Sequence, residues 1–223
     1  MLRLPDIVTP SRLPDAVEAP DVVRRRRVVA AVTIAVGASL LAGTLAAPRG
    51  SVLFFVFGGL AAAAWLVGGL ASGPLHAGRE GSGATRPVGA PIAVGVISFV
   101  VFLIADLVAR HLPVLSSALH RVLSAADAGP VVSVLTLAIV SAVAEEVFFR
   151  GALHSAFGRR RPGLYSTLAY VGVTVVTLNA ALVLAAAVMG TLWSLERRAT
   201  RGVLAPILSH AVWSALMLVA LPR

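Results

Sequence analysis

The chain has 223 residues, of which 58% are hydrophobic and only 13% are charged, with a formal net charge of +9 at pH 7. A soluble domain carries roughly 25% charged residues, so this composition excludes an ordinary soluble protein and predicts an integral membrane protein. The chain has no cysteine, which excludes disulfides and thiolate metal sites. Its positive charge is carried by arginines at the ends of apolar runs, which favours a role in topology and predicts no nucleic-acid partner.

The N-terminal segment, residues 1–27, is polar and proline-rich and ends in the basic run Arg24 to Arg27. It predicts a disordered cytoplasmic tail with a basic flank. A secretory signal would place its basic residues at the very start of the chain. The next run, 28–47, ends in a weakly cleavage-like Leu-Ala-Ala, but its length favours a retained span.

The apolar runs predict an all-α, polytopic membrane protein with about seven transmembrane helices, because about 20 apolar residues cross a bilayer. The fifth and sixth runs are short and meet near Asn179, so a tight hairpin, a re-entrant pair or a total of six spans stays open. The expected spans are 28–47, 52–71, 91–109, 131–149, 164–179, 181–195 and 203–221.

Three further divisions follow from the linkers. Residues 28–71 are expected to form a two-helix hairpin, and the glycine- and proline-rich residues 72–90 a flexible cytoplasmic loop. Residues 91–223 would then form the membrane core. Within this core, 113–129 predicts a short helix lying in the outer interface.

The arginines predict the orientation, because cytoplasmic loops carry an excess of positive charge. A cytoplasmic N-terminus fits best, in a bacterial inner (plasma) membrane, with anionic lipid as a partner of the cytoplasmic arginines. The inside set is Arg3, Arg12, Arg24 to Arg27, Arg79, Arg86, Arg150, Arg159 to Arg161, Arg197, Arg198 and Arg201, and the outside set is Arg49, Arg110, Arg121 and Arg223.

The strongest candidate site lies at Glu145, Glu146 and Arg150, which follow a long uncharged run. Charge at membrane depth is costly and usually marks a functional site. Glu146 and Arg150 share a helix face and are expected to form an ion pair. This pair leaves Glu145, a carboxyl group suited to act as a general base on water. A purely structural polar cluster is the alternative.

Three polar residues elsewhere are candidates for the same site. His210 interrupts an apolar run and has Ser214 four residues on, so the two together would hold a water or donate to an oxyanion. Packing in the core is the alternative for this histidine. Asn179 is either a turn residue or an amide donor that reaches the site.

The sequence Glu-Glu-Val-Phe-Phe-Arg-Gly at 145–151, together with Ala-Pro-Ile-Leu-Ser-His-Ala-Val-Trp-Ser at 205–214, resembles the CPBP family of intramembrane proteases. This family includes CAAX prenyl endopeptidases and bacterial Abi-type proteins linked to bacteriocin processing and immunity. The resemblance covers roughly 91–223. It implies a helical membrane core around a cavity open to the cytoplasm, and a membrane-bound peptide or protein substrate.

The resemblance also implies roles for individual residues. Glu145 would activate water, Glu146 and Arg150 would organise the site, and His210 would stabilise the oxyanion with help from the residue four positions on. It implies a glutamate-dependent mechanism, and we expect no metal and no other cofactor; HExxH is absent.

Two positions depart from the family pattern. Asn179 stands where the FxxxH motif has its histidine, and Ser214 stands where HxxxN has its asparagine. The sequence therefore predicts an intramembrane endopeptidase acting on membrane-associated or prenyl-type substrates. A catalytically impaired member that serves as a binding, scaffold or immunity factor is the alternative, and a proton-coupled transporter is a third hypothesis.

Overall fold

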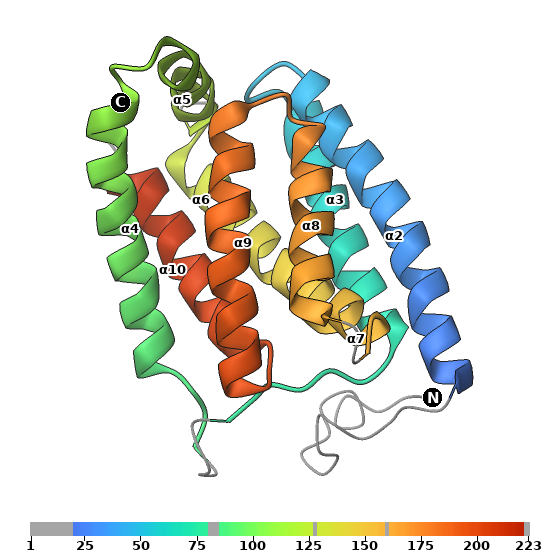
Figure 1. Ribbon diagram of the computed structural model, residues 1–223. Coiled ribbons are helices and arrows are strands. Elements are labelled where there is room, and N and C mark those ends of the chain that lie inside the picture. The colour runs from blue at the N-terminus through green and yellow to red at the C-terminus, as the bar shows by residue number, and fades with distance from the viewer. Residues whose placement is uncertain (1–19, 80–84, 127–128, 159–160, 221–223) are drawn as a thin grey trace.

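The computed structural model describes residues 20–79, 85–126, 129–158 and 161–220. Every element in these ranges is helical, which confirms the all-α class (Figure 1). The elements are α2 (Pro20–Ala46), α3 (Val52–Ser72), α4 (Gly89–Ala109), α5 (Pro113–Ala126), α6 (Val131–Glu146), the π-helix η1 (Val147–Leu153), α7 (His154–Ala156), α8 (Pro162–Val175), α9 (Ala180–Thr200) and α10 (Leu204–Ala220).

Five helical segments are long and apolar enough to cross a membrane, so the chain is a multi-pass membrane protein. The count of seven spans is not confirmed, because α8 has 14 residues and α10 has 17. Helix α8 ends at Val175, and Leu178 adopts a left-handed φ of 49° in the turn that follows. The five segments are Pro20–Ala46, Val52–Ser72, Gly89–Ala109, Val131–Ala156 and Ala180–Thr200.

The prediction of a disordered tail was wrong for residues 20–27, which form the start of α2; residues 1–19 lie outside the described part of the chain. Proline is well suited to the first helical turn, and Asp21 there complements the helix dipole. Arg26 is 1% exposed and donates to Ser72 Oγ (3.2 Å) and to the carbonyl of Pro74 (3.0 Å). This arginine therefore fastens the start of α2 to the end of α3.

The loop between α3 and α4 is fixed in its first part, residues 73–79, which we call the strap. Backbone amides of Val203 and Leu204 donate to carbonyls of His76 (2.8 Å) and Ala77 (3.0 Å), respectively. A Cβ atom on Gly202 would lie 1.9 Å from the backbone nitrogen of Gly78. Backbone hydrogen bonds thus tie the strap to the start of α10, while residues 80–84 lie outside the described ranges. Figure 1 shows the strap crossing the end of the bundle where α9 meets α10.

The predicted helix at 113–129 is present as α5, which ends at Ala126 (Figure 1). It lies at the opposite end of the bundle from the strap, beside the turn between α8 and α9. Residues 127–128 are outside the described chain.

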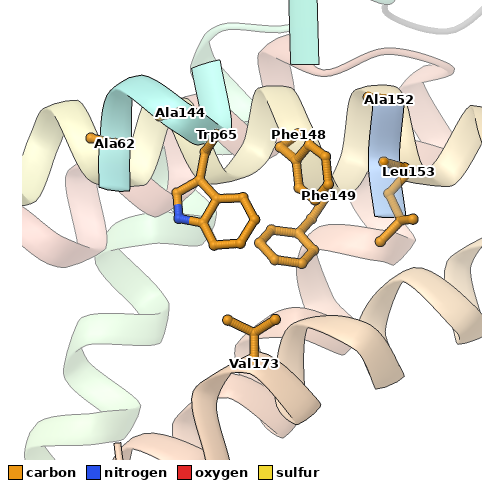
Figure 2. Close-up of a cluster of buried hydrophobic side chains, with 9 residues drawn as sticks. Ala62, Trp65, Ala144, Phe148, Phe149, Ala152, Leu153 and Val173 are labelled. Atoms are coloured by element: carbon orange, nitrogen blue, oxygen red, sulfur yellow. The ribbon is translucent and has the colours of Figure 1, made fainter. Parts of the chain in front are cut away.

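A cluster of buried hydrophobic side chains lies between the N-terminal hairpin and η1 (Figure 2). Trp65 of α3 lies 5.0 Å from Phe148 and 5.1 Å from Phe149, measured between ring centroids. Val173 of α8 closes the same cluster. Aromatic pairs at such distances add packing energy beyond the area they bury. The hairpin therefore supports the helix that carries the candidate site.

Candidate active site

Three of the predicted residues meet in one buried network. Glu146 Oε1 accepts hydrogen bonds from Arg150 Nη1 (3.1 Å) and from Nδ1 of His210 (2.9 Å). Glu146 and Arg150 are fully buried, and His210 is 5% exposed. Glu146 of α6, Arg150 of η1 and His210 of α10 thus bring a carboxylate, a guanidinium and an imidazole together. A buried charge needs such partners, because its desolvation is otherwise uncompensated.

Arg150 is also held by groups of α8 and α9. Its Nη2 donates to the carbonyl of Gly190 (3.1 Å), and its guanidinium lies 4.7 Å from the ring centroid of Tyr170 and 5.3 Å from that of Trp193. Arginine over an aromatic face gains a cation–π attraction that increases in a desolvated site. A Cβ atom on Gly190 would lie 3.1 Å from Arg150 Nη2, so the glycine leaves room for the guanidinium.

The charged residues precede and enter the π-helix η1, whose seven residues are all buried. π-Helical turns are rare and often lie at functional sites. Two carbonyls of this segment receive side-chain donors from neighbouring helices: Ser166 Oγ donates to Phe149 O, and Arg197 Nε donates to Arg150 O (2.9 Å). These donors from α8 and α9 stabilise the irregular turn that displays Arg150.

Glu145 has a different environment from Glu146. It is half-buried, and its Oε2 accepts a hydrogen bond from the Tyr170 hydroxyl (2.9 Å). Among the described residues, Tyr170 is the side-chain hydrogen-bond donor to the Glu145 carboxylate. Its other oxygen, Oε1, forms no hydrogen bond within the described residues.

His210 is oriented by Trp193 as well as by Glu146. The two rings are stacked, with centroids 3.7 Å apart and an interplanar angle of 19°. Because Glu146 accepts at Nδ1, this nitrogen carries a proton, and the imidazole presents Nε2 as its second functional atom. A carboxylate behind one ring nitrogen fixes the tautomer of the ring.

Glu196 of α9 is half-buried and accepts a hydrogen bond from Ser209 Oγ. Ser209 is fully buried and directly precedes His210. Helices α9 and α10 therefore pack closely enough for the serine to reach the carboxylate.

Asn179 does not belong to the network. Its Oδ1 accepts from the backbone of Leu182 (3.1 Å) and caps α9, and its Nδ2 donates to the carbonyl of Ala118 in α5 (2.9 Å). The turn interpretation is therefore confirmed, and the hypothesis that this amide donates into the site is wrong. Ser214, half-buried on α10, forms no side-chain hydrogen bond with the other site residues in the described chain.

Sequence reasoning missed Tyr170, Trp193 and Ser209. All three lie in apolar helices and reach the site across helix interfaces. The weak signal available was that each carries a polar atom in a segment otherwise expected to face lipid or core. Within the described residues, no group of three or more histidine, aspartate or glutamate side chains converges as metal ligands.

Residues 127–216 match the model of a known family, described as type II CAAX prenyl endopeptidase Rce1-like. The match supports the resemblance of this segment to the CPBP family. The segment contains Glu145, Glu146, Arg150 and His210, and it covers less than half of the chain. No curated protein and no solved structure matches the chain. The Rce1-like description is that of a membrane protease, which agrees with the helices long enough to cross a membrane.

Proposed function

We propose that this protein is a glutamate-dependent intramembrane endopeptidase that hydrolyses peptide bonds of membrane-associated or prenyl-type substrates. The observation that carries the proposal is the contrast between the two adjacent carboxylates. Glu146 is fully buried and its Oε1 binds Arg150 and His210, whereas Glu145 is half-buried and, within the described residues, its Oε2 binds Tyr170. This arrangement lies in the segment that matches the Rce1-like family.

In the proposed reaction, Glu145 accepts a proton from a water whose oxygen attacks the carbonyl carbon of the scissile peptide bond. The carboxyl group then returns this proton to the leaving amine, so peptide and water give an acid and an amine. A positioned base of this kind contributes about 10²- to 10⁴-fold to a rate.

His210 serves the developing oxyanion in this proposal. In a protonated ring, Nδ1–H donates a hydrogen bond to Glu146. The second N–H group, at Nε2, is then available to the oxygen that gains charge. A neutral ring of the same tautomer would present a lone pair at Nε2 and would act as a base instead. The effect of replacing Glu145 distinguishes these two schemes, because only the first requires Glu145 as the base.

The departure at Asn179 does not count against activity, because that residue caps a helix away from the network. Tyr170 and Thr174 of α8 have the aromatic-x-x-x-polar spacing of FxxxH, and the Tyr170 hydroxyl reaches Glu145. Thr174 itself does not reach the site, because its hydroxyl donates to the carbonyl of Tyr170 (2.9 Å).

We further propose a bacterial inner (plasma) membrane location with a cytoplasmic N-terminus. The exposed arginines at the strap end of the bundle would contact anionic lipid. Arg24, Arg198 and Arg201 are exposed there, whereas Arg25 and Arg27 donate to the carbonyls of Ala71 and Ala156.

The test is proteolysis by the purified full-length protein in liposomes, with matched prenylated and unmodified membrane peptides. Wild type should cleave, and Glu145→Ala should lose cleavage while its thermal unfolding midpoint stays near that of wild type. Equal cleavage by wild type and Glu145→Ala would remove Glu145 from the mechanism. A wild type that cleaves no peptide but retains a binding partner would favour the catalytically impaired alternative.

A further inference from the structure

The hydroxyl group of Tyr170 stands out because phenylalanine would pack equally well at this position. The ring lies 5.0 Å from Phe149 and 6.1 Å from Trp193, both in edge-to-face geometry. Its face carries the Arg150 guanidinium at 4.7 Å. These contacts hold the ring from η1 and α9 and use its hydrocarbon surface, so none of them requires the oxygen atom.

Within the described residues, the oxygen donates a 2.9 Å hydrogen bond to Glu145 Oε2. A phenol donates to a carboxylate at ordinary pH, and bonds of this charge-assisted kind are about twice as strong as neutral ones. Because the ring is fixed on several sides, the position of its hydroxyl oxygen is fixed as well. The carboxylate of Glu145 is thereby held by a rigid donor from a neighbouring helix, rather than free to rotate.

We infer that Tyr170 is the positioning residue of Glu145: it binds one carboxylate oxygen and thereby aims the other at the attacking water. The inference rests on the proposed function. In this scheme the phenolic proton stays on Tyr170 throughout. The proton that moves comes from water, passes to the free oxygen of Glu145 and then goes to the leaving amine, so no further reactant is needed.

The chain offers a matched control, because it has only two tyrosines and both lie on α8. Tyr165 is 43% exposed and packs its ring against Phe157 at 5.1 Å, away from the carboxylates. Tyr170→Phe and Tyr165→Phe each remove one oxygen atom from the same helix. A difference between them reports on the contact with Glu145 rather than on loss of a tyrosine.

Two readouts test the inference on the full-length protein. The first is the infrared carboxyl band of Glu145, assigned by its absence in Glu145→Gln; it should shift in Tyr170→Phe and stay unchanged in Tyr165→Phe. The second is peptide cleavage in liposomes, where Tyr170→Phe should lower kcat roughly 10- to 100-fold while leaving KM within about twofold, from the size of a hydrogen bond to a charged group. Tyr165→Phe should leave both constants at the wild-type values.

An unmoved band in Tyr170→Phe would overturn the contact, and an unchanged kcat would overturn its role in positioning. A change in KM alone would also overturn it, because a positioning residue acts on the chemical step. If wild type cleaves none of the peptides, the proposed function fails and the positioning role fails with it. The infrared band would then still show whether Tyr170 binds Glu145, so the two failures are distinguishable.

Discussion

Two carboxylate–arginine pairs, Asp106–Arg110 of α4 and Glu146–Arg150 of α6 and η1, have the same four-residue spacing in apolar helices. In the first, the Arg110 side chain is 47% exposed at the helix end, and its Nε and Nη2 both donate to Asp106 Oδ2. In the second, both side chains are fully buried and have partners on α8, α9 and α10. Equal spacing thus gives a local pair with an exposed arginine in one place and the centre of a network in the other.

The difference teaches which buried charges deserve a functional hypothesis. In an i,i+4 pair near a helix end, each side chain is the hydrogen-bond partner of the other, and the exposed member is solvated, so the pair costs little free energy. A pair whose members also bind residues from other helices is buried despite the cost of desolvating its charges, which points to a functional role. In this molecule the additional partners are His210, Tyr170 and Trp193.

The largest expected contrast is in stability. Arg150→Leu leaves the fully buried carboxylate of Glu146 without its cation, so we expect a loss of about 3–5 kcal/mol in the free energy of unfolding. Arg110→Leu should cost much less, because Arg110 reaches the solvent or the headgroups. Unfolding of both variants in detergent, followed by circular dichroism, measures the contrast. Equal losses would show that the two pairs are equivalent.

The second prediction concerns the link between α6 and α10. His210→Ala removes a hydrogen bond to a charged group, and we expect a loss of about 1.5–3 kcal/mol from this bond. Cleavage should fall as well, because Nε2 is lost from the site. The same unfolding measurement, combined with peptide cleavage, checks this. Full cleavage by His210→Ala would exclude the histidine from the reaction.

The third prediction applies to a polar residue outside the network. Asn179→Ala loses the cap of α9 and the bond to Ala118, so we expect a loss of about 0.5–2 kcal/mol with unchanged cleavage. Asn179→Ser is the control, because serine retains the ability to cap. Loss of cleavage in a folded Asn179→Ala would contradict its assignment as a structural residue.

Much of the fold could be predicted because a bilayer span requires a long apolar run, and five such runs coincide with helices long enough to cross. The rest depends on tertiary contacts. Burial of Arg26 against α3 accompanies a helical start at Pro20, and backbone bonds to Val203 and Leu204 fix the strap. Such contacts join segments that no local pattern connects.

For the site, the spacing of Glu146 and Arg150 predicted their ion pair, and the polarity of His210 made it a candidate. The sequence did not distinguish Asn179 from a site residue, because the same asparagine pattern fits both a helix cap and an amide that faces a cavity. Tyr170 and Trp193 were missed since both resemble ordinary aromatic residues of a membrane helix. Their roles depend on how α8 and α9 face η1, which becomes visible only in three dimensions.

The most direct test of the account is the rate of peptide cleavage by Glu146→Gln and Asp106→Asn, measured side by side on the purified protein in liposomes. Both substitutions neutralise a buried carboxylate that pairs with an arginine four residues on. The account predicts that Glu146→Gln loses cleavage by about 10² or more, because His210 loses its orienting carboxylate, while Asp106→Asn stays near wild type. Similar rates for the two variants would contradict the claim that the network around Glu146 is the site of hydrolysis.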